Sequence, residues 1–129
     1  MPGHFAPRHI PALFSATTTT LGGMLAMFHA RATMLSFGLP AHIANVPVTW
    51  PVWVIGQAHA SIIGILIFIF YFRRQLDIVD IILGVSSGYA ALVDSYVVWS
   101  QGEAAKAALR LIVTGLFCAW GLAGLTSRR

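Results

Sequence analysis

Residues 52–72 read VWVIGQAHASIIGILIFIFYF, an apolar run that lies between Pro51 and the Arg73–Arg74 pair. About 20 apolar residues are enough for an α-helix to cross the hydrocarbon core of a bilayer. Proline is favoured in the first turn of a helix, and the two arginines end the apolar run. The stretch therefore predicts a transmembrane helix. Its first half nevertheless contains three polar residues: Gln57, His59 and Ser61.

The composition of the whole chain is that of an integral membrane protein. Hydrophobic residues make up 57% of the 129 residues and charged residues only 9%, and the mean hydropathy is +0.78. Soluble domains have about a quarter of their residues charged. The net charge of +4 comes from basic residues scattered between apolar runs, without the basic face of a nucleic-acid-binding protein. We therefore expect a membrane protein with no nucleic-acid partner.

Four apolar segments organise the chain. We expect helices over about residues 10–28, 52–72, 78–99 and 104–126, in a single integral membrane domain that covers residues 1–129. The fold class predicted is an all-α membrane four-helix bundle. A cleaved signal peptide is the alternative for the first segment, but its apolar run is too long and too polar for that role, so we expect a retained helix.

The positive charges predict the orientation of this bundle. Five arginines fall on one side of the predicted spans, whereas Arg31 and Lys106 fall on the other. Because loops rich in Lys and Arg stay on the cytoplasmic side, we expect both termini to be cytoplasmic. Residues 29–51, the long connection, would then face the lumen or the exterior.

Polar and charged residues within the predicted helices indicate a buried site. The third helix carries a stripe of small and acidic residues at helical spacing: Asp80, Gly84, Ser87, Ala91 and Asp94. Small residues let membrane helices pack closely. A charge near the middle of a membrane, however, costs about 2.5–3.5 kcal/mol even on a permissive scale. Counting from the turns places Asp94 and Arg110 at the same depth, so each can compensate the other.

The same counting places Gln57 and His59 close to this depth. A histidine beside Asp94 and Arg110 would form a general acid–base group, because imidazole titrates near neutrality, a carboxylate orients it and a guanidinium stabilises a negative oxygen. The candidate catalytic residues are thus His59, Asp94 and Arg110. The candidates for binding a lipophilic substrate are Gln57, Trp53 and Tyr96.

Structural explanations of these residues stay open. Asp94 and Arg110 can form a buried ion pair that only fixes the helix register, and His59 can be satisfied by a backbone carbonyl or by Asp94. Gln57 and His59 are two positions apart, so they cannot share one helix face.

The sequence does not identify a cofactor. Its histidines have no HxxxH or HExxH spacing, and it contains neither a P-loop nor a GxGxxG fingerprint. The single cysteine, Cys118, excludes a thiolate metal cage. No metal site is predicted, and no residue pattern supports a haem.

Three stretches resemble a small membrane family catalogued as domain of unknown function 4267. They are SFGLP at 36–40, IGQAHASIIG at 55–64 and GYAALVDSYVVWSQGEAAKAAL at 88–109. The resemblance covers roughly residues 20–125. Asp94 and Gly102 match the family pattern, whereas Gln57, Ala58 and His59 stand where the family typically has an arginine and an acidic residue. The resemblance implies a four-helix membrane bundle and, among fungal members, an association with specialised-metabolite pathways.

Two classes of function are compatible with these features. The first is a membrane-embedded enzyme, or an obligate subunit of a membrane-bound oxidoreductase or cyclase, that oxidises, isomerises or cyclises a lipophilic small molecule in such a pathway. The second is a non-catalytic membrane scaffold or partner subunit that recruits or stabilises another enzyme. The small-residue stripes predict contacts with another membrane protein or enzyme subunit. We expect the protein in the endoplasmic reticulum or another endomembrane.

Overall fold

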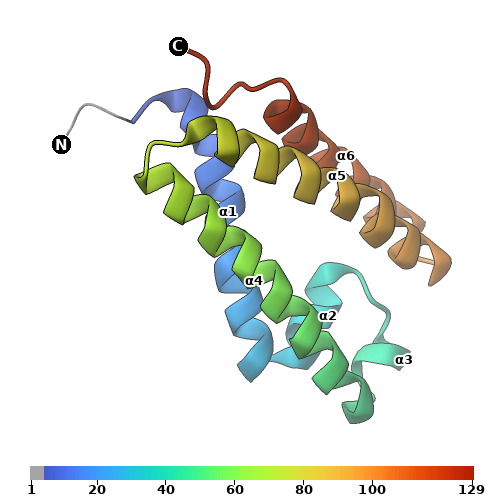
Figure 1. Ribbon diagram of the computed structural model, residues 1–129. Helices are drawn as coiled ribbons and strands as arrows, with labels where there is room; N and C mark the ends of the chain where they lie inside the picture. The colour runs from blue at the N-terminus through green and yellow to red at the C-terminus, as the bar shows by residue number, and fades with distance from the viewer. Residues whose placement is uncertain (1–4) are drawn as a thin grey trace.

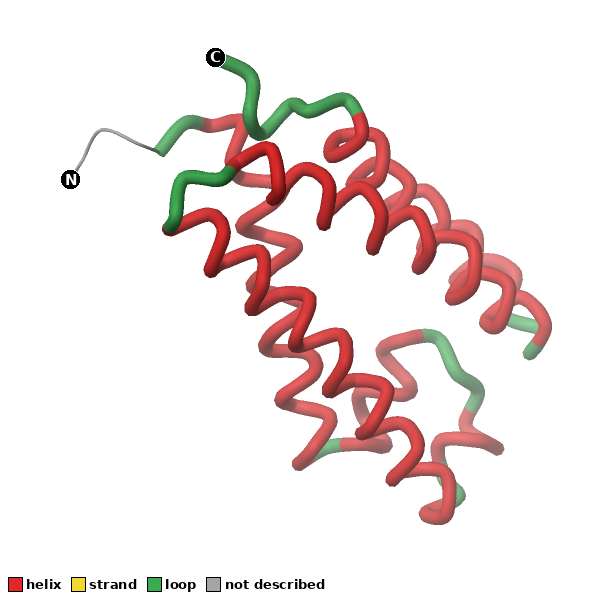
Figure 2. Tube along the Cα trace, in the orientation of Figure 1, coloured by secondary structure: helices red, strands yellow, loops and turns green. Residues whose placement is uncertain are grey.

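The computed structural model describes residues 5–129, and its regular structure is entirely helical (Figure 2). Four long helices form its body: α1 (Ile10–Phe28), α4 (Trp50–Phe72), α5 (Leu76–Ser100) and α6 (Ala104–Leu122). Each lies in a segment that is long and apolar enough to cross a membrane. The predicted all-α class and the four predicted spans are confirmed, and the protein is an integral membrane protein.

The four long helices form two closely packed antiparallel pairs. Helix α1 packs along α4, and α5 packs along α6 (Figure 1). The two pairs meet near the chain termini and diverge toward the other end of the molecule, so that together they resemble a V (Figure 1). We call the meeting point the closed end and the opposite side the open end. This splayed arrangement was not predicted from the sequence.

Glycines set the short distance within each pair. A Cβ atom at Gly121 of α6 would collide with the backbone of Asp80 and Gly84 on α5. A Cβ atom at Gly23 of α1 would collide with Ser61 on α4. Because small residues allow membrane helices to approach closely, these positions hold each pair together. The predicted stripe on the third helix accounts for the contact at Gly84, whereas the contact of Gly23 with Ser61 lies in the other pair.

The closed end contains the main apolar core. Buried side chains from three of the long helices meet there: Ala12, Ala16, Ile67, Val79 and Leu83. A hydrogen bond of 3.0 Å also joins His9 Nδ1, at the start of α1, to the Tyr71 hydroxyl near the end of α4. The closed end is therefore fixed by packing and by polar contacts.

Helix α6 ends at Leu122, before the expected boundary at residue 126. Gly124 has a φ of 64°, a conformation that glycine adopts readily. Asp80 is only 2% exposed and accepts hydrogen bonds from the backbone N–H groups of Thr126 (3.1 Å) and Ser127 (2.8 Å). The carboxylate thus provides acceptors for a chain that leaves the helix and turns toward α5.

The long connection folds into short helices at the open end. Helix α2 (Ala30–Phe37) runs back from the end of α1 toward the centre of the V (Figure 1). It stops at Gly38, which has a φ of 116°. The chain then forms α3 (Ala41–Ala44) and the 3₁₀ turn η2 (Pro47–Thr49) before α4 begins. Another 3₁₀ turn, η1 (Pro7–His9), precedes α1.

Candidate functional site

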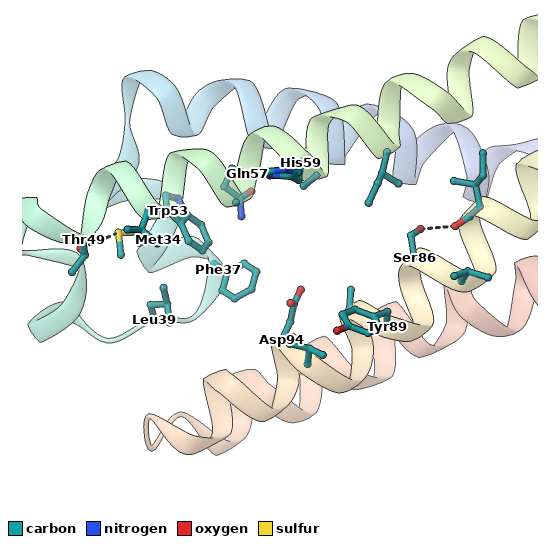
Figure 3. A pocket seen from close by; sticks show the side chains of 18 of the residues that line it. Met34, Phe37, Leu39, Thr49, Trp53, Gln57, His59, Ser86, Tyr89 and Asp94 are labelled. Atoms are coloured by element: carbon teal, nitrogen blue, oxygen red, sulfur yellow. Dashed lines mark hydrogen bonds between the residues drawn. The ribbon is translucent and has the colours of Figure 1, made fainter.

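The divergence of the two helix pairs leaves a cavity of about 1160 Å³ between α4, α5 and the α2 segment. Most of its wall is aliphatic or aromatic, and its polar side chains include Gln57, Ser86 and Asp94 (Figure 3). Val52 and Val85 line it although they are 74% and 62% exposed, so the cavity opens sideways. In a bilayer this opening would face lipid chains. We call this space the lateral cavity.

A second cavity of about 450 Å³ adjoins the first between the two helix pairs. It is more polar, because Thr18, Thr19 and Arg110 contribute to its wall. Gln57 and Asp94 line both cavities. These two side chains therefore stand at the boundary between the apolar space and the polar one.

Asp94 and Arg110 form an ion pair at this boundary. The Asp94 Oδ2 atom lies 3.5 Å from Arg110 Nη1, and the two side chains are 30% and 24% exposed. The pairing expected from helix depth is thus present in the structure. Each charge compensates the other, which reduces the cost of placing both within the membrane-spanning region.

Arg110 also holds the end of α2. Its Nε and Nη2 atoms donate hydrogen bonds to the Phe37 carbonyl oxygen at 3.2 and 3.0 Å. Its guanidinium carbon lies 3.7 Å from the centroid of the Phe37 ring. The last carbonyl groups of a helix have no partner within the helix and attract cations, and a guanidinium over an aromatic ring gains a cation–π interaction. One arginine therefore joins α2, α5 and α6.

Phe37 was missed as a site residue, although the sequence contained a signal for its position. The SFGLP stretch places a glycine and then a proline just after it, which is a common end of a helix. A helix that ends inside a membrane needs a donor for its free carbonyls.

Trp53 and Gln57 form the α4 side of the site. Trp53 meets Phe37 edge to face at 4.9 Å between ring centroids, and its Nε1 donates a hydrogen bond of 2.9 Å to the Thr33 hydroxyl. Gln57 points into the lateral cavity toward Asp94, which projects from α5 on the opposite wall (Figure 3). Five of the six candidate residues therefore line the lateral cavity or pair with a residue that does: Trp53, Gln57, His59, Asp94 and Arg110.

A model of the domain of unknown function DUF4267 matches residues 16–124. The chain belongs to this family. The match runs from α1 to the turn after α6, so every element of the site lies within the DUF4267 region. No curated protein and no solved structure matches the chain.

His59 takes a different position in this DUF4267 member from the one expected. It is exposed, and its Nδ1 lies 2.8 Å from the Ile55 carbonyl oxygen one helical turn earlier. It lines the lateral cavity, but within residues 5–129 no hydrogen bond joins it to Asp94 or Arg110. The reason is rotation about the helix axis, because two positions turn the side chain well away from the direction of Gln57.

Tyr96 lies apart from the lateral cavity. It is 65% exposed, packs near Trp99 at 6.2 Å between ring centroids, and lines a small groove between α5 and α6. Its position two residues after Asp94 points it to another side of α5. The aromatic residues that do line the cavity with Trp53 are Phe37 and Tyr89.

Metal ligands do not gather in the described part of the chain. Within residues 5–129 no group of three His, Cys, Asp or Glu side chains lies close enough to hold a metal ion. The hydrogen-bonding groups that the site offers to a ligand include the Asp94 carboxylate, the Gln57 amide and the remaining N–H groups of Arg110, with His59 and Tyr89 on the wall of the lateral cavity.

Proposed function

We propose that this protein is a membrane-embedded enzyme, or the obligate membrane subunit of one, that acts on a lipophilic small molecule in a specialised-metabolite pathway. The observation that carries the proposal is the lateral cavity, whose apolar walls lead to the paired Asp94 and Arg110. Ligand sites are typically apolar clefts with a few convergent polar groups. The sideways opening suits a substrate that enters from the bilayer.

The residues at the boundary can transfer a proton. The ion pair joins Oδ2 of Asp94 to Arg110, so we assign to Oδ1 the role of taking a proton from a bound substrate and returning it at another position. Such a step is common to isomerisation and cyclisation. A negative substrate oxygen would be stabilised by Gln57 and by Arg110, which has five N–H donors and commits only some of them. His59 lines the same cavity, and its Nε2 belongs to this proposed acid–base set.

The surroundings of the ion pair favour this function over a purely structural pair. A pair that only fixed helix register would be enclosed by packed side chains. Asp94 and Arg110 instead keep about a quarter to a third of their side-chain surface exposed and line open space. The second candidate function, a non-catalytic partner subunit for another enzyme, is favoured by the way in which Arg110 holds α2.

Product formation separates the two candidates. Membranes that contain the protein and candidate pathway enzymes, added one at a time, are compared for wild type, Asp94→Asn and Asp77→Asn at equal amounts of folded protein. Asp77 is an exposed aspartate in the first turn of α5, so it is a matched control. Asp94→Asn is expected to lower product formation by about a hundredfold or more, and Asp77→Asn to leave it unchanged. Undiminished product with Asp94→Asn would support the partner subunit.

We also propose that the protein lies in the endoplasmic reticulum or another endomembrane, with both termini in the cytoplasm. The start of α1, the end of α6 and the turn between α4 and α5 lie at the closed end (Figure 1). That turn contains Arg73 and Arg74, and positive residues favour the cytoplasmic side. In a Cys118→Ser background, Arg74→Cys should react with an impermeant maleimide added outside sealed microsomes. Protection until the microsomes are opened would reverse the orientation.

A further inference from the structure

We infer that the lateral cavity selects an uncharged lipophile with a hydroxyl head, an alcohol or a phenol, held between Asp94 and Gln57. The inference rests on the proposed function, because it names the class of molecule that the same cavity takes. It depends on how charges and hydrogen-bonding groups are distributed over the cavity wall.

An anionic head is disfavoured by the position of the charges. Among the described residues that line the lateral cavity, Asp94 is the only Asp, Glu, Lys or Arg, whereas Arg110 lines the smaller cavity behind it and not the lateral one. A carboxylate or phosphate that entered from the bilayer would meet the Asp94 carboxylate first and, because Arg110 already balances that carboxylate, would add a negative charge without a counterion of its own. Like charges repel strongly where little water screens them.

A cationic head is disfavoured because Asp94 is already neutralised. Arg110 lies 3.5 Å from its carboxylate. An ammonium group would add a positive charge to a balanced pair, and this charge would lack a counterion of its own. Burial of an uncompensated charge costs several kcal/mol, so the balanced pair favours a neutral ligand.

Hydrogen-bonding capacity at the boundary fits a hydroxyl group. Gln57 and Asp94 point toward one another from opposite walls (Figure 3). A hydroxyl between them can donate to Asp94 and accept from the Gln57 amide N–H.

Three other polar groups on the wall are already engaged with the protein. The Ser86 hydroxyl donates to the Ile82 carbonyl at 2.6 Å, the Thr49 hydroxyl donates to the Val46 carbonyl at 2.7 Å, and the Trp53 N–H is bound to Thr33. His59 and Tyr89 also line the lateral cavity, but Asp94 and Gln57 lie at its boundary with the second cavity and offer an acceptor and a donor from opposite walls (Figure 3).

A displacement experiment tests the selection. Trp53 lies in the cavity wall, so a protein that keeps only this tryptophan (Trp50→Phe, Trp99→Phe, Trp120→Phe) reports occupancy in lipid nanodiscs. The headless probe 1-bromododecane quenches a tryptophan that it contacts. Dodecanol, dodecanoate and dodecylammonium then compete at equal membrane concentration and mildly alkaline pH, where the last two are charged. The matched control keeps only Trp99, which is 61% exposed on α5 and lies outside the lateral cavity.

The outcomes separate this inference from the proposed function. Bromododecane should quench Trp53 more than Trp99, and dodecanol should relieve the quenching at about one tenth of the concentration that either charged competitor needs, as expected for one hydrogen bond to a charged group. Equal potency of the three competitors would overturn the inference while the cavity remained a lipophile site. Equal quenching of Trp53 and Trp99 would count against both.

Two substitutions test the assignment to Asp94 and Gln57. Gln57→Leu should raise the dodecanol concentration that relieves the quenching about fivefold. Gln101→Leu, in the exposed turn between α5 and α6, should leave this concentration unchanged. Asp94→Asn leaves the positive charge of Arg110 without a partner. Dodecanoate should then relieve the quenching of Trp53 at a lower concentration than dodecanol does. An unchanged order of potency in both site variants, each with wild-type helix content by circular dichroism, would contradict the proposed position of the head.

Discussion

Asp80 and Asp94 lie on the same helix and in the same stripe of small and acidic residues, but they have different surroundings. Asp80 at the closed end is 2% exposed, and both of its carboxylate oxygens accept backbone N–H groups. Asp94 toward the open end is 30% exposed in its side chain, is paired through one oxygen and lines two cavities. Both oxygens of Asp80 accept hydrogen bonds from the protein itself, whereas the Asp94 carboxylate can also accept one from a ligand.

The difference follows from the distance between the helix pairs. Where α5 lies against α6 and the two pairs meet, the backbone itself satisfies an acidic side chain. Where the pairs diverge, Asp94 lines open space, and its ion-pair partner Arg110 comes from the other helix of its own pair. Two aspartates in the same stripe of one helix therefore differ in role. The one at the closed end stabilises the fold, and the one toward the open end can bind a ligand.

The largest loss of stability is expected when a methyl group is added at the close contact between α5 and α6. Gly121→Ala would push its Cβ into the backbone of Asp80 and Gly84, and overpacking of this kind costs about 3 kcal/mol when backbone must move. Thermal unfolding in detergent should show the loss. Gly115→Ala on the same helix, where a Cβ meets nothing within 4 Å, should be neutral or slightly stabilising. Similar unfolding temperatures for the two variants would mean that this contact does not hold the pair.

The two aspartates can be compared by the same substitution. Asp80→Asn replaces one acceptor by an NH₂ group that faces a backbone N–H, so we expect a loss of about 2 kcal/mol in the free energy of unfolding. Asp94→Asn removes one partly exposed ion-pair partner, and Arg110 keeps its hydrogen bonds to the Phe37 carbonyl and its exposure to the cavity, so the cost should be about 1 kcal/mol or less. Chemical unfolding in mixed micelles measures both. If Asp94→Asn lowered the free energy of unfolding more than Asp80→Asn, Asp94 rather than Asp80 would be the carboxylate that stabilises the fold.

Removal of the cation that joins α2 to α6 should loosen the open end alone. Arg110→Gln loses the paired hydrogen bonds to Phe37, at an expected cost of about 1–2 kcal/mol. In a Cys118→Ser background, Met34→Cys reports the opening, because Met34 is 2% exposed. Its reaction with a maleimide should become about tenfold faster. Lys106→Gln is the control, since Lys106 pairs only with the neighbouring Glu103 at the surface, and it should leave the rate unchanged.

The smallest effect on stability is expected at His59. Its side chain is exposed and contacts its own helix backbone, so His59→Ala should change the free energy of unfolding by no more than about 0.5 kcal/mol. Product formation by the same variant then tests its proposed catalytic role. A loss of about a hundredfold keeps His59 in the acid–base set, and undiminished product removes it.

Local properties of the chain accounted for the elements and for the depth of the site. The apolar runs predicted four spans, and the fixed rise of a helix placed Asp94 level with Arg110, which the structure pairs. Helix rotation was harder to predict. Gln57 faces the cavity and Tyr96 does not, and a helix that is apolar on most sides gives little sign of which side turns inward.

The sequence by itself determined the membrane class, the spans and the need for a charge partner, because hydropathy, helix rise and the cost of a buried charge are properties of single segments. Tertiary structure decided that the spans separate into two pairs, that Asp80 holds residues 126–127, and that Arg110 holds the Phe37 carbonyl. These contacts join segments far apart in the chain. Their geometry depends on how closely glycines let the helices approach and on where α2 turns back, and both are set only when all the helices pack together.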